Sequence, residues 1–249
     1  MLSDVSTGGS TDMGGSRELH FSIIIPAHNE EKYIGATLEH AANLSYPVES
    51  FEVIVVENGS SDRTYDHAKQ FEGPNIRVFK NDRAGVSAAK NFGIDQLSPL
   101  SDWVVFLDAD TILKPGFLRD LDAKLRASRK PLAVGTTKVL PLGGGWHART
   151  WFACYDLLHR LGGSYAIQIA KRSLFPTLRF DEHLIMGEDL LLIKQARKLG
   201  KFFYVPTPTV YTSTRRFDSV GYWRLYFQWA SFEILPRRLQ KRRGYKVVR

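Results

Sequence analysis

The chain has 249 residues, of which 43% are hydrophobic and 24% charged, an ordinary balance that excludes a wholly disordered or fibrous protein. Its single cysteine, Cys154, excludes an internal disulfide and a cysteine-based zinc site, and it favours a reducing compartment. The net charge of +8 lies entirely in residues 212–249, which hold ten basic and two acidic side chains.

Residues 1–19 are rich in Gly and Ser and show no hydrophobic periodicity. We therefore expect a disordered leader and no signal peptide. No stretch of the sequence approaches the roughly 18 uncharged apolar residues of a membrane-spanning helix, so none is expected.

The body of the chain then alternates two kinds of pattern. Short apolar runs predict buried strands at residues 21–26, 51–56, 76–79 and 103–107. Helical spacing predicts helices at residues 29–44, 61–71 and 86–97. Ser61 or Asp62 is the expected cap of the second of these helices. Such alternation is typical of a layered α/β fold with a largely parallel sheet.

This rhythm loosens after about residue 133. Residues 143–145 are three glycines and predict a flexible turn. Two further glycines at 162–163 precede a strand-like run at 165–170, and helical periodicity returns at 188–199 with Gly200 as the expected stop.

Ligands of layered α/β folds bind beyond the carboxyl ends of the strands. The polar side chains at these ends are therefore the first candidates for a site: His28, Asn29, Glu30, Glu57, Asn58, Ser60, Asp108 and Asp110. The pair Asp108 and Asp110 directly follows a buried strand and suits Mg²⁺ or Mn²⁺, which take one or two carboxylates together with phosphate oxygens. The alternative for this pair is a solvated turn with helix-capping aspartates.

Glu188 and Asp189 open a predicted helix. Acidic residues are favoured there by the helix dipole, which is the structural explanation. A positioned carboxylate can instead act as a general base toward a hydroxyl group.

Five motifs, taken in order, resemble the inverting nucleotide-sugar glycosyltransferases of family 2, which have the GT-A fold. They occupy residues 22–30 (SIIIPAHNE), 53–62 (VIVVENGSSD), 85–94 (GVSAAKNFGI), 104–110 (VVFLDAD) and 187–189 (GED). The resemblance implies a Rossmann-like three-layer α/β/α fold with a mostly parallel central sheet. It implies a single catalytic domain at 20–217, with a nucleotide-binding half at about 20–132 and an acceptor half at about 133–217, followed by an aromatic and basic C-terminal helix and tail at 218–249.

The implied enzyme moves a sugar from a UDP- or GDP-sugar to an acceptor hydroxyl with inversion, depends on Mn²⁺ or Mg²⁺, and serves cell-surface glycan or glycolipid synthesis. The resemblance makes Asp189 the catalytic base, with Glu188 beside it, and makes Asp110 and Asp108 the metal ligands. It also implies a set of donor-binding residues: Pro26, Ala27, Glu30, Glu57, Asn58, Ser60, Lys90, Asp108, Arg215 and Arg216. A solvated basic turn is the alternative for the two arginines.

The chain departs from the family pattern at three places. Glu57 and Asn58 stand where the family usually has two aspartates, which leaves the preference for uridine open. Lys90 stands where an arginine is usual, which keeps the charge but loses the bidentate geometry. The Gln-x-x-Arg-Trp signature of processive synthases is missing after Gln228, so we expect a non-processive enzyme.

Residues 220–235 are rich in aromatic side chains and a basic run follows them. One interpretation is a helix packed on the body with a solvated tail. The other is an interfacial helix on anionic lipid, which would suit a lipid-linked acceptor and a cytoplasmic enzyme held peripherally at the cytoplasmic face of the inner membrane. No spacing selects a histidine for the metal site, so none is included from His28, His147, His159 and His183.

Two other classes of protein remain as alternatives. Asp108 and Asp110 fit the two aspartates of the Asp-x-Asp-x-Thr motif of haloacid-dehalogenase-like phosphatases, with Thr111 following them directly, and Asp108 would be the nucleophile. That motif normally opens its domain, whereas here two other strand-end motifs precede it. A nucleic-acid-binding module would use the basic tail. Because the rest of the chain is electrically neutral, no nucleic acid partner is expected.

Overall fold

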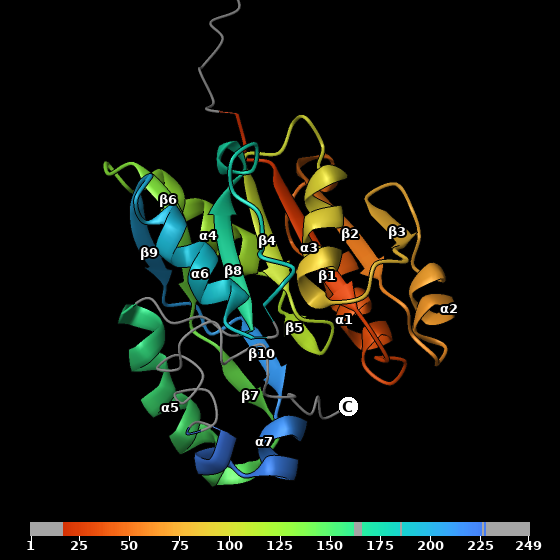
Figure 1. Cartoon of the computed structure of the whole chain (residues 1–249). Coiled ribbons are helices and arrows are strands. Elements are labelled where there is room, and N and C mark those ends of the chain that lie inside the picture. Colours follow the sequence, from red (N-terminus) through yellow and green to blue (C-terminus); the bar gives the residue numbers. More distant parts are fainter. Residues whose placement is uncertain (1–16, 162–165, 185, 226, 228–249) are drawn as a thin grey trace, which may run out of the picture.

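The structure, a computed structural model, describes residues 17–161, 166–184, 186–225 and 227 (Figure 1). The strands in this part of the chain are β1 (Phe21–Ala27), β2 (Phe51–Glu57), β3 (Ile76–Lys80), β4 (Trp103–Leu107), β5 (Thr111–Leu113), β6 (Leu132–Thr137), β7 (Leu140–Leu142), β8 (Ile167–Lys171), β9 (Lys201–Val205) and β10 (Val210–Ser213). The helices are α1 (Ile34–Ala42), α2 (Thr64–Lys69), α3 (Val86–Asp95), α4 (Phe117–Arg126), α5 (Gly145–Leu161), α6 (Glu188–Ala196) and α7 (Arg215–Val220).

The central sheet has seven strands in the order β3-β2-β1-β4-β8-β6-β9. All pairs are parallel except those of β8, which runs antiparallel to both of its neighbours, β4 and β6. The predicted α/β fold with a mostly parallel central sheet is therefore confirmed. Strands β1, β2 and β4 are continuous apolar runs because helices cover them on both faces, so neither set of side chains meets water.

Alternate side chains of the strands pack in two separate hydrophobic cores, one on each face of the sheet, so the fold has three layers. Ile23 of β1 packs in the core that also holds Leu38 of α1 and Leu121 of α4. Its neighbour Ile24 points to the other face, into the core that holds Ile193 of α6. Figure 1 shows the helices lying on the two sides of the sheet.

A second sheet has the order β5-β10-β7 and lies beyond the carboxyl end of β4. The N–H of Ser213, at the end of β10, donates to the carbonyl of Asp110 (3.2 Å). This small sheet therefore brings the segment around residue 213, far along the chain, to the turn that follows β4.

The second half of the chain is more regular than its sequence indicates. Strands β6, β8 and β9 extend the central sheet, so the sheet does not stop near residue 133. Helices α4 and α5 have no counterpart among the predicted elements. Helix α6 ends at Ala196, four residues before the predicted stop at Gly200. A side chain at position 200 would lie 2.8 Å from the carbonyl oxygen of Pro131, so this glycine serves the close approach of two segments.

Both ends of the predicted catalytic domain differ from the structure where it describes them. Arg17 pairs with Asp102 (2.7 Å) and the carbonyl of Leu19 accepts from the hydroxyl of Tyr46 (3.0 Å), so residues 17–19 are bound to the body. The boundary at 217 falls inside α7, and Leu225, eight residues later, is buried in the main core. The rest of the predicted leader and of the predicted C-terminal tail lies outside the described residues. Within the described part, no helix is long and apolar enough to cross a bilayer.

Candidate active site

The loops that follow β1 and β2 are tied to each other at one edge of the sheet. Pro26 and Ala27 end β1 in register with Val56 and Glu57 of β2. Asn29 has a positive φ of 55°. Its N–H donates to the hydroxyl of Ser60 (3.0 Å), and its side-chain oxygen accepts from the N–H of Ser61 (2.8 Å).

The side chains of Glu57 and Asn58 are buried and shape the same edge. The carboxylate of Glu57 accepts from the N–H of Ser60 (2.5 Å), and the amide of Asn58 donates to the carbonyl of Gly85 (2.7 Å). The predicted cap of α2 is wrong by one residue or more, because Arg63 and not Ser61 or Asp62 is the N-cap. The carboxylate of Asp62, one residue before it, accepts from the N–H of Thr64, the first helical residue (3.0 Å).

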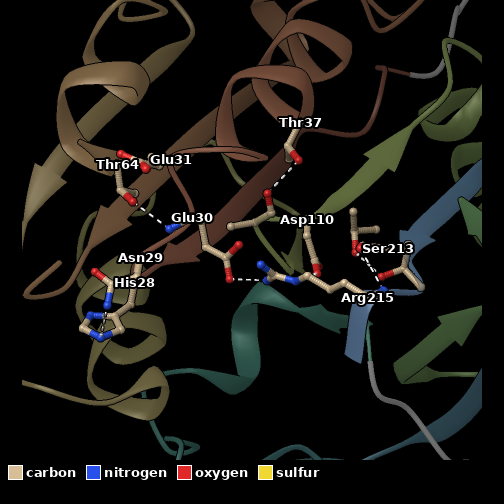
Figure 2. A network of polar contacts seen from close by, with 12 residues as sticks. His28, Asn29, Glu30, Glu31, Thr37, Thr64, Asp110, Ser213 and Arg215 are labelled. Carbon is tan, nitrogen blue, oxygen red and sulfur yellow. Dashed lines mark hydrogen bonds and ion pairs between the residues drawn. The ribbon is translucent and has the colours of Figure 1, made fainter. Parts of the chain in front are cut away.

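The turn after β4 presents two carboxylates. It is held by two hydrogen bonds, from the N–H of Thr111 to the carbonyl of Asp108 (3.0 Å) and from the hydroxyl of Thr37 to the carbonyl of Ala109 (2.8 Å). Figure 2 shows the second of these bonds as the dashed line that starts at Thr37. With its backbone held in this way, the turn positions the Asp108 and Asp110 side chains on the strand's carboxyl end.

Arg215, the first residue of α7, joins the ends of two strands. Its guanidinium contacts the carboxylate of Glu30 (2.5 Å) and the carboxylate of Asp110 (3.2 Å), as Figure 2 shows. It also lies over the ring of Tyr33, 4.3 Å from the centroid. One cation thus neutralises a carboxylate that follows β1 and another that follows β4.

The start of α6 presents the other acidic pair. Gly187 precedes the helix in the left-handed conformation (φ 81°), which a side chain would strain. The ammonium of Lys90, on α3, lies 2.6 Å from a carboxylate oxygen of Asp189 and 3.9 Å from Glu188. The Lys90 side chain is only 2% exposed, and its ammonium also donates to Gln168 (3.3 Å) and lies over the ring of Phe180.

Three carboxyl groups of this site have pKa values above their ordinary ones. Burial raises the pKa of Asp108 well above its ordinary value, opposed by Lys90 and assisted by Asp110 and Asp189. Burial likewise raises the pKa of Asp110, against the pull of Arg215 and Arg216. Burial and then the charge of Asp189 raise the pKa of Glu188 to about 7.

These interactions bring the two acidic motifs together. Asp108 interacts electrostatically with Lys90, Asp110, Asp189 and Arg216, so the end of β4, α3, the start of α6 and α7 share one site. Five carboxylates meet only three basic side chains there: Glu30, Asp108, Asp110, Glu188 and Asp189 against Lys90, Arg215 and Arg216.

This excess of carboxyl groups over basic side chains fits a divalent cation, whose charge would favour their ionised forms. No group of three His, Cys, Asp or Glu side chains suited to a metal gathers in the described residues. Asp108 and Asp110 offer two carboxylates, which is what Mg²⁺ usually takes when a substrate diphosphate supplies other oxygens. The residues present therefore fit a cation that binds together with a phosphate-bearing ligand.

Three residues that belong to the site did not stand out in the sequence. Gln168 is 1% exposed in β8 and is a polar residue within an apolar run, a signal that could have identified it. Tyr33 and Phe180 contact the cations through their rings, and nothing in the local sequence indicates that role.

Comparison with known structures identifies the class of this fold. In structure, the chain is similar to S. aureus TarS in complex with UDP-GlcNAc, with a TM-score of 0.65 and 21% identity over 79% of this chain and 59% of that one. It is also similar to glucosyl-3-phosphoglycerate synthase from Mycobacterium tuberculosis in complex with Mn²⁺, UDP and phosphoglyceric acid, with a TM-score of 0.58 and 23% identity over 82% and 74% of the two chains. These likenesses show a GT-A transferase fold.

Comparison of sequences assigns the chain to a family. The profile described as "Glycosyl transferase family 2" matches residues 22–181, more than half of the chain, so the protein belongs to that family. A relative is the dolichyl N-acetyl-alpha-D-glucosaminyl phosphate 3-beta-D-2,3-diacetamido-2,3-dideoxy-beta-D-glucuronosyltransferase of Methanococcus voltae, 28% identical over an alignment of 209 positions. The match covers 72% of this chain and 63% of the relative. The chain thus spans less than two thirds of that relative. The family match gives no support to the phosphatase alternative.

Proposed function

We propose that this protein is an inverting glycosyltransferase that moves a sugar from a nucleoside-diphosphate donor to an acceptor hydroxyl, as a non-processive enzyme of cell-surface glycan or glycolipid synthesis. The observation that carries this proposal is the common site of Asp108, Asp110 and Asp189, which come from distant parts of the chain. Family membership and the complexes of the two structural neighbours with UDP-GlcNAc and UDP support it.

In the proposed reaction Asp189 accepts the proton of the acceptor hydroxyl. The acceptor oxygen forms a bond to the anomeric carbon while the bond from that carbon to the diphosphate oxygen breaks, and the electron pair leaves with the diphosphate. Arg215 and Arg216 are proposed to neutralise the departing charge, and their interaction with Asp110, a proposed metal ligand, supports this role. Attack opposite the leaving group inverts the anomeric centre.

Asp108 and Asp110 are the proposed ligands of Mn²⁺ or Mg²⁺. When bound, the cation would stabilise negative charge on the diphosphate. The neighbour solved with Mn²⁺ and UDP supports this choice.

The remaining donor contacts are proposed from the family resemblance. Pro26, Ala27, Glu57, Asn58 and Ser60 form the edge between β1 and β2, beside Glu30. We propose that this edge borders the nucleoside, as UDP or GDP.

Lys90 is proposed to bind the donor, as its motif implies, and also to position the base. Its contact with Asp189 supports a role in positioning the base, and its electrostatic interaction with Asp108 keeps it near the proposed donor site.

For the acceptor we propose a glycan or a lipid-linked saccharide. The relative from Methanococcus voltae, whose name includes a dolichyl phosphate sugar, supports this choice. We further propose a peripheral membrane contact through residues 220–249, at the cytoplasmic face of the inner membrane. Of these, Trp223 and Phe227 are described and are 67% and 64% exposed.

The first experiment separates the two acidic residues at the start of α6. Asp189→Asn should bind the donor normally, because the amide keeps the shape, but lower transfer by about 10²-fold or more, because no base remains. Donor binding is measured by calorimetry with UDP- and GDP-sugars plus Mn²⁺, and transfer by nucleotide release from the same panel.

Two companion variants make the result specific. Asp95→Asn removes an exposed carboxylate paired with Arg179 and should leave turnover unchanged. A loss of transfer in Glu188→Gln with near-normal turnover in Asp189→Asn would assign the base to Glu188, whose pKa of about 7 also suits that role. Absence of nucleotide release from every sugar donor would overturn the proposed function itself.

A further inference from the structure

Exposed apolar side chains gather on one part of the molecule. The structure exposes ten large hydrophobic side chains in its described residues, and six of them fall in the two segments 142–161 and 221–227. They are Leu142, Trp146, Leu157, Leu161, Trp223 and Phe227, with exposures of 44–70%. Such a cluster on a protein of this size marks an interaction surface.

The two segments form a single surface, here called the α5 face, made of the outer side of α5 and residues 221–225 and 227. The ring of Trp151 on α5 packs edge-on against Trp223 (4.9 Å between centroids) and against Tyr222 (5.8 Å). Trp223 in turn lies 6.4 Å from Phe227. In Figure 1 α5 and the blue end of the described chain lie together, below the central sheet.

The charged groups of the α5 face have one sign. Arg149, Arg160 and Arg224 are exposed on it. The only acidic residue in these two segments, among those described, is Asp156, which is buried and bonded to Arg160 and Tyr204. Residues 228–249, which follow directly in the sequence, add seven basic side chains and one acidic one.

We propose that the α5 face docks on the surface of an anionic lipid bilayer. Tryptophan and leucine side chains enter the boundary between headgroups and acyl chains, while arginines pair with anionic headgroups. A second copy of this chain is a poorer occupant, because a symmetric contact would set these arginines against the same arginines without an exposed acid. The cationic segment 228–249 has the same sign as the α5 face and is a poorer occupant for the same reason.

This docking extends the membrane contact proposed above to a helix that lies outside residues 220–249. It does not depend on the transfer reaction. If the proposed function also holds, this contact places the bilayer near the site. Leu142, three residues before α5 begins, pairs in register with Ser213, which lies two residues before Arg215. The bilayer would then lie beside the site at which a lipid-linked acceptor must arrive.

The test is co-sedimentation of the full-length protein with phosphatidylcholine vesicles, with and without phosphatidylglycerol. The variant carries Trp146→Ser, Leu157→Gln and Leu161→Gln, three exposed positions on α5. The control carries Leu100→Gln and Leu199→Gln, which are 63% and 57% exposed elsewhere. We expect the protein and its control to bind anionic vesicles, and the α5 variant to bind at least about tenfold more weakly, because its apolar contact area is lost.

Three results would overturn the proposal: equal binding of the α5 variant and the wild type, equal binding to neutral and anionic vesicles, and an effect of the α5 variant on self-association in sedimentation without an effect on vesicles. Nucleotide release measured without vesicles should be the same in the wild type, variant and control. Failure of the proposed function would remove that release from all three proteins and leave the vesicle result unaffected.

Discussion

Lys90 shows how one buried cation organises the candidate site. Its ammonium is bonded to Asp189 and lies near Glu188, and these two carboxylates raise its pKa in spite of the opposing effect of burial. A buried charge of this kind is stable only with its partners, so Lys90 and Asp189 depend on each other. The usual arginine of this motif would carry the same charge in a larger, planar group.

Replacement of Lys90 tests its positioning role. Lys90→Met should lower kcat by about 10²-fold, a larger effect than on the donor KM, because the ion pair that holds the Asp189 carboxylate in place is lost. Lys90→Arg keeps the charge and should restore most of kcat. An increase in the donor KM with an unchanged kcat would limit Lys90 to donor binding.

Glu188 should make stability depend on pH. Its pKa in the folded protein is about 7 against an ordinary value of 4.5, so the folded state holds this proton more strongly than the unfolded chain does. The stability it contributes is fully present below pH 4.5 and is lost as the pH rises through about 7. Relative to the wild type, Glu188→Gln should gain on the order of 2 kcal/mol between pH 5 and pH 8.

This gain is measured by urea denaturation in the presence of a chelator. Glu39→Gln, an exposed carboxylate on α1, is the control for the loss of one acidic side chain. A difference between Glu188→Gln and wild type that stays constant with pH would show that burial of the Glu188 carboxyl carries no such cost.

The candidate acidic residues could be found from the sequence because they directly follow strands or open a helix. The basic side chains that pair with them could not be assigned from the sequence. Arg215 reaches Glu30 across 185 positions of the sequence, and Lys90 reaches Asp189 across 99. A local sequence pattern covers only a few residues and cannot relate positions so far apart. Only the fold shows which basic side chain faces which carboxylate.

At the scale of elements, the first half of the fold was predictable because its strands are buried on both faces and read as unbroken apolar runs. In the second half, the predicted strand-like run at 165–170 and the predicted helix at 188–199 correspond to β8 and α6, but β6, β9 and β10 were not predicted. β6 contains Gly135, Thr136 and Thr137, which weaken its strand pattern, and it lies beside the antiparallel β8, so the βα alternation is lost there. Helix α5 was missed because three glycines of positive φ precede or open it and because its outer side carries exposed apolar residues.

Close packing of α3 on β1 predicts a sharp difference between two helical glycines. A methyl group at Gly93 would lie 2.6 Å from a side-chain carbon of Ile24, so Gly93→Ala should destabilise the protein by about 1–2 kcal/mol despite its better helix propensity. Gly35 on α1 has its nearest neighbour at 4.0 Å, so Gly35→Ala should stabilise by about 0.5 kcal/mol. Urea midpoints of both variants that shift in the same direction would contradict this prediction.

At the scale of the whole molecule, the site connects segments from residue 30 to residue 216, so ligands that fill it should stabilise the entire fold. A ligand at 100 times its Kd adds about 2.7 kcal/mol, or roughly 5–10 °C in Tm for a chain of this size. We expect UDP or GDP with Mn²⁺ to give such a shift in calorimetry, larger than either component alone. In Asp110→Ala the effect of Mn²⁺ should disappear; an undiminished shift would remove Asp110 from the proposed metal site.

The ion pairs that join Glu30, Arg215 and Asp110 limit how far the chain can be truncated. The family match ends at residue 181, yet a fragment trimmed to that point would lose β9 from the sheet's outer edge and, with α7, the guanidinium shared by those two acids. The boundary of the family match therefore underestimates the smallest fragment expected to fold. That fragment must include Leu225, because this side chain is part of the main hydrophobic core.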